Sequence, residues 1–597
     1  MNSMAKRTHK RASRAFATET RLKCYGAVGE ARHRLARWVA VGGVVCALLP
    51  WAARAQASSH SAAASTDSAC AGCHRSIYEH YEATPMARAS GAAMDGLIKG
   101  SFTHAASGVH YRIFERDGAG WLSYARPETA AGGYLSGEVK LAYFIGSNTR
   151  GRTYLFERDG YWFETPVNWY AKKRVWDMAP NYLDAREMPL TLPVDANCLH
   201  CHVGGVGVAL AGARNHFAAT PFAHGGIGCA SCHGDAVEHV RTKGTAAVLN
   251  PAKLDAARRD SICLQCHLEG ETAAYRLGHS LATYRPGEPL FDSVAYFVHQ
   301  GEVGPAGRAT SQYEALLQSA CKRASGDRMT CTTCHDPHAS ETAATAAERV
   351  AYYRARCLSC HTGAKFVTAH HPEQPDCARC HMPRGASEDI AHEQVTDHRI
   401  QIPVLNTASQ IPNGASERRA KKSGALVPIG KEKATDRELG LAYAQIAQQR
   451  GDRASGEMAL ALLRKAEAME AATVKDAELH TQLGLLEQKA GDIHAADWEY
   501  RGALAADPDD GTARGDLAIL FAGTGDYETA VRLWQRVFAA DPTQAAAGYN
   551  LALGQCRLGQ KDDAEKTLKR LLQFAPDNQR ARALAAALAG GSQHCGG

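Results

Sequence analysis

The chain has 597 residues, 45% hydrophobic and 22% charged, which is typical of a soluble globular protein with several domains. Its formal charge is +6, but residues 1–57 contribute +9 of this and the remainder carries −3. The net positive charge therefore comes from the N-terminal residues, and we do not predict a nucleic-acid partner from it. Nineteen cysteines and 27 histidines are too many for an ordinary enzyme, so their spacing has to explain them.

The N-terminus has the pattern of an export signal. An arginine-rich stretch ends at Arg37, an uncharged apolar run follows at 38–53, and small residues suited to cleavage come next. The run is shorter than the roughly 20 residues that a membrane helix needs. We expect residues 1–57 to be a signal peptide and the mature chain to have no integral membrane span; the alternative is that this segment is an uncleaved membrane anchor. The expected location is the bacterial periplasm, with an extracellular or envelope-associated site as the alternative.

Residues 66–402 are dense in cysteine and histidine and contain one motif repeated seven times. Every Cys-x-x-Cys pair in the chain is followed directly by a histidine. The motifs lie at 70–74, 198–202, 229–233, 263–267, 331–335, 357–361 and 377–381, and we number them 1 to 7 in this order. The paired cysteines are Cys70 and Cys73, Cys198 and Cys201, Cys229 and Cys232, Cys263 and Cys266, Cys331 and Cys334, Cys357 and Cys360, and Cys377 and Cys380. The histidines are His74, His202, His233, His267, His335, His361 and His381.

This spacing predicts covalent attachment of haem c. Two thiols three positions apart can form thioethers with the two vinyl groups of one porphyrin, and the next residue supplies the proximal imidazole to its iron. Zinc sites also use Cys-x-x-Cys pairs, but they do not need a histidine beside each one. Disulfide redox motifs seldom occur seven times in one chain. We therefore predict seven covalently bound haem c groups. Outside the motifs, Cys321, Cys556 and Cys595 are expected to be buried thiols or an occasional disulfide.

Residues 101–176 differ from the rest of this domain. They lack cysteine, are rich in aromatic residues and alternate apolar with polar positions around Asp-Gly pairs, which is the signal of β-hairpins. We predict a small antiparallel β insert between the first two motifs.

The last part of the chain repeats with a period of 34. Residues 403–433 look like a linker, and after residue 434 the composition changes to helix formers. Glycines recur at 491, 525 and 559, and prolines at 508, 542 and 576. This resembles tetratricopeptide repeats, with three clear units and an irregular fourth at 436–470. The predicted fold is mainly α: a multihaem cytochrome domain with a small β insert, followed by an α-solenoid over 434–590 that binds a protein or peptide.

Each iron needs a sixth ligand, and residues 66–400 hold fourteen further histidines. Several stand in short phrases beside a motif and can serve a neighbouring haem. The predicted distal ligands are Met86, His104, His239, His338, His371, His392 and His398. Met86 follows the first motif where a ligand is expected, and methionine ligation raises haem potential. We therefore predict that haem 1 has His/Met ligation and the highest potential.

The phrases around these residues resemble the cytochrome c-554-type multihaem superfamily, which also includes hydroxylamine oxidoreductase and octahaem reductases. The resemblance rests on CAGCHRSIYEHYEATPMARA, CHGDAVEHV, CTTCHDPH and DCARCHMP with TDHRI, and it covers about residues 66–402. It implies closely packed haem pairs with distal ligands from neighbouring segments, for which His104, His239, His338, His371 and His398 match ligand phrases. The chain has no Cys-x-x-Cys-Lys motif and no eighth haem motif.

We assign no catalytic residue, because no residue matches the catalytic motifs of this superfamily. The predicted function is an electron carrier whose seven haems form a chain and whose repeats dock a redox partner protein. One alternative is an oxidoreductase that acts on a small nitrogen or sulfur compound at a haem with an open distal site. In the other, the haems are mainly structural or sensory and the repeats assemble an envelope complex.

Overall fold

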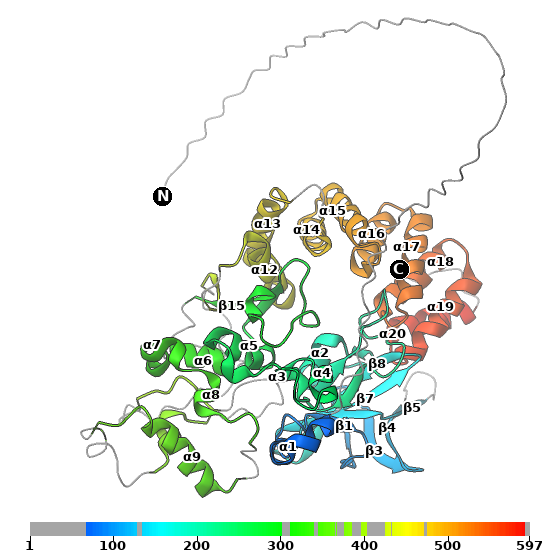
Figure 1. The fold of residues 1–597 in the computed structure, drawn as a ribbon. Helices are drawn as coiled ribbons and strands as arrows, with labels where there is room; N and C mark the ends of the chain where they lie inside the picture. The colour runs from blue at the N-terminus through cyan, green and yellow to red at the C-terminus, as the bar shows by residue number, and fades with distance from the viewer. Residues whose placement is uncertain are drawn as a thin grey trace, which may run out of the picture. The chain divides into compact units, whose positions relative to one another are not determined.

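The computed structural model describes residues 67–127, 134–300, 311–339, 344–363, 366, 375–384, 396–402, 424–430, 433–470 and 475–590 (Figure 1). The signal peptide predicted at 1–57 and most of the linker predicted at 403–433 lie outside these residues. In the described part, short helices and small antiparallel sheets extend as far as residue 430, and the segments after it are helical. This agrees in outline with the predicted mainly α class containing small antiparallel sheets.

The aromatic-rich segment forms two antiparallel sheets. One is a meander in the order β2-β3-β4-β5; the other runs β1-β6-β7-β8-β11, with β9 paired to β7 and β10 to β9. Two of the hairpins turn at Asp117-Gly118 and Asp159-Gly160, where all four residues have positive φ, as a tight two-residue turn requires. The strands are β1 (Ser90–Ala92), β2 (Gly100–Thr103), β3 (His110–Arg116), β4 (Ala119–Pro127), β5 (Tyr134–Lys140), β6 (Tyr143–Ile145), β7 (Gly151–Arg158), β8 (Tyr161–Glu164), β9 (Val167–Tyr170), β10 (Val175–Met178) and β11 (Leu192–Pro193).

Each of the seven motifs overlaps a helix, and four of these helices are only four or five residues long. Helix α1 continues through motif 1 but is kinked at His74, where φ is −111° and ψ is 39°. The motif-bearing helices are α1 (Asp67–Glu82), α2 (Ala196–His200), α3 (Ala230–His233), α5 (Ala256–His267), α8 (Cys331–Cys334), α9 (Ala346–Leu358) and α11 (Cys377–His381). Between them lie α4 (Val237–Arg241), α6 (Gln312–Gln318), α7 (Ala320–Ser325), and the short 3-10 turns η1 (Pro180–Tyr182), η2 (Pro251–Lys253), η3 (Leu290–Asp292) and η4 (Gly326–Arg328). Two further sheets pair β12 (Val203–Val206) with β13 (Phe222–Gly225), and β14 (Thr272–Tyr275) and β16 (Leu426–Pro428) with β15 (Val294–His299).

The C-terminal part consists of consecutive helices, most of which form pairs. Gly491, Gly525 and Gly559 follow the first helices of three pairs with φ of 90°, 88° and 77°, a conformation that glycine adopts without strain. Pro508, Pro542 and Pro576 each come two residues after the second helix of a pair, as the period of 34 predicts. The helices are α12 (Asp436–Arg450), α13 (Arg453–Glu467), α14 (Ala477–Ala490), α15 (Ile493–Ala506), α16 (Gly511–Gly523), α17 (Tyr527–Ala540), α18 (Ala545–Arg557), α19 (Lys561–Phe574) and α20 (Gln579–Ala589).

Both ends of this helical stretch pack against the preceding part of the chain. At its start, α12 shares an apolar cluster with β14, β15 and β16, and the Gln445 amide donates to the carbonyl of Ala273. At its end, Phe574 is 1% exposed within the core of the β segment. The buried Asp577 carboxylate accepts from Arg126 at 2.5 Å and from the Met188 N–H at 2.8 Å. The repeats are therefore joined to the rest of the protein by two sets of buried contacts.

Candidate haem-binding sites

The fourteen motif cysteines are all free thiols, and none is joined to its Cys-x-x-Cys partner. Each is partly or fully exposed to solvent. Free cysteine is among the residue types most often buried, so thiols at this exposure call for an explanation. The arrangement fits thioether attachment, because both sulfurs of each motif remain available for a porphyrin.

Thiols of different motifs meet across the fold. Four pairs of thiols lie close enough that one shifts the pKa of the other: Cys70 with Cys229, Cys201 with Cys266, Cys263 with Cys331, and Cys357 with Cys377. Motif 1 is therefore adjacent to motif 3, motif 2 to 4, motif 4 to 5, and motif 6 to 7. Electrostatic contacts of Cys232 with Cys263 and of Cys334 with Cys360 add neighbours between motifs 3 and 4 and between motifs 5 and 6. Together these contacts connect all seven motifs.

Three motif histidines face a second imidazole. The ring centroids of His74 and His239 are 6.4 Å apart, and their planes differ by 14°. Those of His233 and His338 are 6.0 Å apart with the same angle, and those of His335 and His398 are 6.2 Å apart at 31°. An imidazole binds a metal at about 2.0–2.1 Å, so two imidazoles on opposite sides of one metal have centroids about 6 Å apart. Each pair thus leaves the space that one axially ligated iron would occupy.

Hydrogen bonds at Nδ1 fix the orientation of four of the imidazole rings. Nδ1 of His233 lies 2.9 Å from the carbonyl oxygen of Leu249, and Nδ1 of His239 lies 2.7 Å from that of Ala246. The same contact joins Nδ1 of His381 to Gln401 at 2.7 Å, and Nδ1 of His398 to Thr396 at 2.8 Å. A carbonyl can only accept, so Nδ1 carries the hydrogen and Nε2 keeps its lone pair. This is the tautomer that binds a metal through Nε2, with its orientation fixed by the second nitrogen.

The local electrostatics also favour neutral imidazoles. Burial lowers the pKa of His267, and the nearby His335 and His398 lower it further. Burial also lowers the pKa of His338; Asp336 opposes this effect and His233 adds to it. A neutral imidazole is the form that binds a metal.

The three imidazole pairs interleave along the chain. The partner of motif 1 follows motif 3, the partner of motif 3 follows motif 5, and the partner of motif 5 follows motif 7. His239, His338 and His398, all predicted as distal ligands, are therefore each brought opposite a motif histidine. The sequence leaves this pairing open, because each partner lies at least 63 residues from the histidine it faces.

Two other predicted ligands lie elsewhere. His239 stands opposite His74, in the place predicted for Met86. The Met86 carbonyl accepts from the N–H of Ile227, near motif 3. In His104, Nδ1 bonds the Ser107 hydroxyl at 2.9 Å and Nε2 bonds the Leu183 carbonyl at 2.8 Å, so protein atoms occupy both ring nitrogens. His371 and His392 lie outside the described residues, and the ligand roles of Met86 and His104 stay predictions without geometric support.

The segment that contains motifs 5 to 7 has no buried apolar core among its described residues. Among the described residues between 316 and 402, no hydrophobic side chain is fully buried. Helix α9 has thirteen residues and buries none of them. A folded segment ordinarily needs such burial to offset its loss of conformational entropy. The residues here fit a large apolar cofactor that would provide the missing contact surface.

Outside the motifs, Cys556 is disulfide-bonded, which is one of the two predicted states, whereas Cys321 is a partly exposed free thiol rather than a buried one. Cys595 lies outside the described residues.

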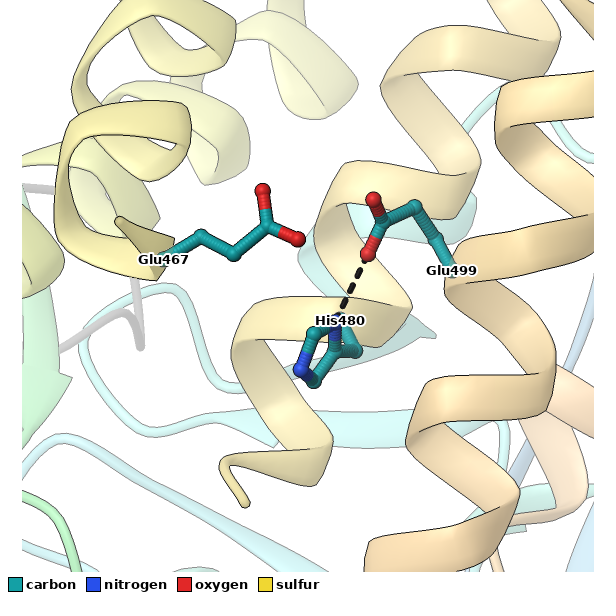
Figure 2. A group of neighbouring side chains, drawn as sticks. All are labelled: Glu467, His480 and Glu499. Carbon is teal, nitrogen blue, oxygen red and sulfur yellow. Dashed lines mark hydrogen bonds and ion pairs between the residues drawn. The ribbon is translucent and has the colours of Figure 1, made fainter. Parts of the chain in front are cut away.

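A second cluster of ionisable groups lies in the helical stretch. Figure 2 shows Glu467, His480 and Glu499, which come from α13, α14 and α15, with the His480 ring bonded to Glu499 at 2.7 Å. Their ligand atoms are close enough to bind a metal ion, but the Arg464 guanidinium already pairs with both glutamates. Arg464 also bonds Glu487 at 2.6 Å. The cluster is therefore a partly buried ion-pair network in which the Arg464 guanidinium already supplies the positive charge.

Family comparisons agree with these features. The family described as cytochrome c554 and c-prime matches residues 171–234, and a doubled CXXCH motif matches residues 323–366. A tetratricopeptide repeat family matches residues 521–588. The chain is a multihaem cytochrome c fused to tetratricopeptide repeats. The motifs and the family together indicate that this cytochrome carries covalently bound haem c.

Other comparisons add little about this cytochrome. No curated protein matches it. Among solved structures, MamA from AMB-1 is 22% identical, with 26% of this chain and 80% of that chain covered and a TM-score of 0.23. A tetratricopeptide repeat protein from Parabacteroides merdae is 23% identical, with 24% and 57% covered and a TM-score of 0.22. TM-scores this low establish no shared overall fold. In the described part of the cytochrome, no helix has the length and apolarity needed to cross a membrane.

Proposed function

We propose that this protein is an exported electron carrier with seven haem c groups, located in the bacterial periplasm. Haem iron, when bound, changes reversibly between its ferrous and ferric states. The observation that carries the proposal is the set of three facing imidazole pairs, at centroid distances of 6.0–6.4 Å. An iron held by both imidazoles of a pair would have no position left for a substrate, which would suit electron transfer rather than catalysis at these three motifs.

The residues divide the work between attachment, ligation and orientation. The two cysteines of each motif would hold the porphyrin, and the motif histidine would supply one imidazole to its iron. His239, His338 and His398 would supply the second imidazole at motifs 1, 3 and 5. The carbonyls of Leu249 and Ala246 hold His233 and His239 in the binding tautomer. Because cysteines of neighbouring motifs lie close together, haems bound at motifs 1 to 7 would form a connected series through which electrons could pass.

The repeats are proposed to dock a redox partner protein. Tetratricopeptide repeats generally bind peptides or proteins. The two ends of the helical stretch are buried against the protein's own β segments, so the docking surface is assigned to the exposed faces between them. Because these contacts hold the repeats against the haem region, a docked partner would be kept near the haems.

The test is low-temperature electron spin resonance on the purified, matured protein, with and without cyanide. The carrier proposal predicts low-spin signals that cyanide does not change. A high-spin haem that binds cyanide would contradict it and favour the alternative, an oxidoreductase with one open distal site.

A further inference from the structure

An aspartate stands three positions before the first cysteine in three of the motifs. These residues are Asp67 before Cys70, Asp195 before Cys198 and Asp260 before Cys263. Aspartate is a favoured cap at a helix start, because its carboxylate accepts the unpaired N–H groups of the first turn. The local expectation is therefore that an aspartate caps its own motif's helix where that helix begins beside it, as α2 does at Asp195. Helix α5 begins at Ala256 and is capped by Asp255, so Asp260 lies inside it.

Asp195 bonds within its own motif's helix, whereas Asp67 and Asp260 each bond the backbone of another motif. The Asp195 carboxylate accepts from the backbone N–H groups of Asn197 and Cys198, at 3.0 and 3.1 Å, within its own helix. The Asp67 carboxylate instead accepts from the N–H of Cys229 in motif 3, at 3.0 Å. The Asp260 carboxylate accepts from the N–H of Cys331 in motif 5, at 2.9 Å.

Asp67 and Asp260 share one geometry. Asp67 links motif 1 to motif 3, and Asp260 links motif 4 to motif 5. In both pairs the first cysteines of the two motifs also interact electrostatically. The same arrangement thus occurs twice, from segments far apart in sequence. Asp260 is 4% exposed, and the ammonium of Lys322 lies 3.9 Å from its second oxygen.

We propose that Asp67 and Asp260 are positioning residues that each hold two haem motifs side by side as one unit. The inference rests on the haem attachment proposed above. Each carboxylate bonds the backbone of the cysteine that fixes the second porphyrin, so it sets the placement of that motif relative to the first. It also puts an acidic group beside both attachment points, and a nearby negative charge favours the ferric state. Asp67 and Asp260 therefore lower the reduction potentials of two haems each, whereas Asp195 acts on one.

The experiment uses the matured full-length protein and compares Asp260→Asn, Asp260→Ala and the matched control Asp195→Ala. Asparagine keeps the oxygen that accepts from Cys331 but removes the charge; alanine removes both. Haem content is measured by intact mass, potentials by a spectroscopic redox titration, and haem environments by low-temperature spin resonance.

Asp260→Asn is expected to retain every haem and to shift two components of the titration to higher potential. Asp260→Ala is expected to shift the same two and also to change the resonance signals of two haems, while Asp195→Ala affects only one. An Asp260→Asn titration that matches wild type, with haem content unchanged, would overturn the inference, even where Asp260→Ala fails to mature. A change at a single haem in the Asp260 variants would overturn it as well. Haem-free wild-type protein would be a separate result, which contradicts the proposed function.

Discussion

The haem region around motifs 5 to 7 and the helical repeats are stabilised in different ways. In the repeats, Ala496, Tyr500 and Leu568 are at most 1% exposed and form part of apolar clusters shared by successive helices. Between residues 316 and 402, the described hydrophobic side chains remain at least partly exposed. A polypeptide core therefore stabilises the repeats, whereas we propose that covalently attached haem stabilises the region around motifs 5 to 7. The difference means that haem loss and core mutation should damage different parts of the molecule.

The largest effect is expected from removing one haem attachment in the region without an apolar core. The double variant Cys331→Ser with Cys334→Ser should lose one haem and become sensitive to protease within 316–402, while the repeats stay resistant. The measurement is limited proteolysis with mass mapping of the fragments. The control is Cys321→Ser, which removes a free thiol outside the motifs and should leave haem content and cleavage unchanged. Equal cleavage of both regions would contradict the contrast.

A second large effect concerns the distal ligand at motif 1. His239→Ala should convert one low-spin haem to a high-spin form that binds cyanide, because His239 faces His74 at 6.4 Å. Met86→Ala should leave the spin resonance spectrum unchanged. A loss of low-spin signal in Met86→Ala, together with an unchanged spectrum in His239→Ala, would support the predicted His/Met ligation of haem 1.

A smaller effect is expected where the repeats meet the β segment. Phe574 is 1% exposed and packs edge-on against Tyr161, with ring centroids 5.7 Å apart. Phe574→Ala should destabilise this junction by about 3–5 kcal/mol, as for other buried aromatic truncations. Thermal unfolding followed by far-ultraviolet circular dichroism measures the change, and Ile493→Ala, at a 42% exposed site, is the control. Equal melting temperatures for the two variants would show that the junction contributes little.

The smallest effect is a pH dependence in the repeats. A hydrogen bond to Glu499 raises the pKa of His480, outweighing burial, and Glu470 adds to the rise. A raised pKa means that the charged ring stabilises the fold below its unfolded pKa, and that this stabilisation is lost as pH rises through the folded value. The repeats should therefore melt at a lower temperature at pH 8 than at pH 6, and the difference should shrink in His480→Gln. An unchanged pH difference in the variant would assign it to other groups.

The two regions also differ in how much the sequence predicts. The proline and glycine phases locate the helix pairs, and the Asp-Gly pairs locate hairpin turns, because these signals depend on local backbone geometry. The Cys-x-x-Cys-His spacing identifies the haem attachment points for the same reason. The facing partners of His74, His233 and His335 come from segments two motifs further along the chain, and no local pattern specifies that pairing.

Non-local contacts account for the other differences. Met86 has the expected sequence position, but the fold brings His239 opposite His74. Nε2 of His104 is hydrogen-bonded to the carbonyl of Leu183, so the ring nitrogen that would bind iron already has a protein partner. The burial of Phe574 against the β segment has no signature in the repeat pattern. The aspartates at 67 and 260 can be recognised by their spacing before a motif, yet that spacing alone does not separate them from Asp195.

The most direct test of the central claim is the intact mass of the matured, secreted protein under denaturing conditions. The account predicts the mass of the processed polypeptide plus seven haem groups, retained after unfolding because thioethers are covalent. A mass equal to that of the bare polypeptide, or lowered only by the hydrogens lost in disulfide formation, would contradict it.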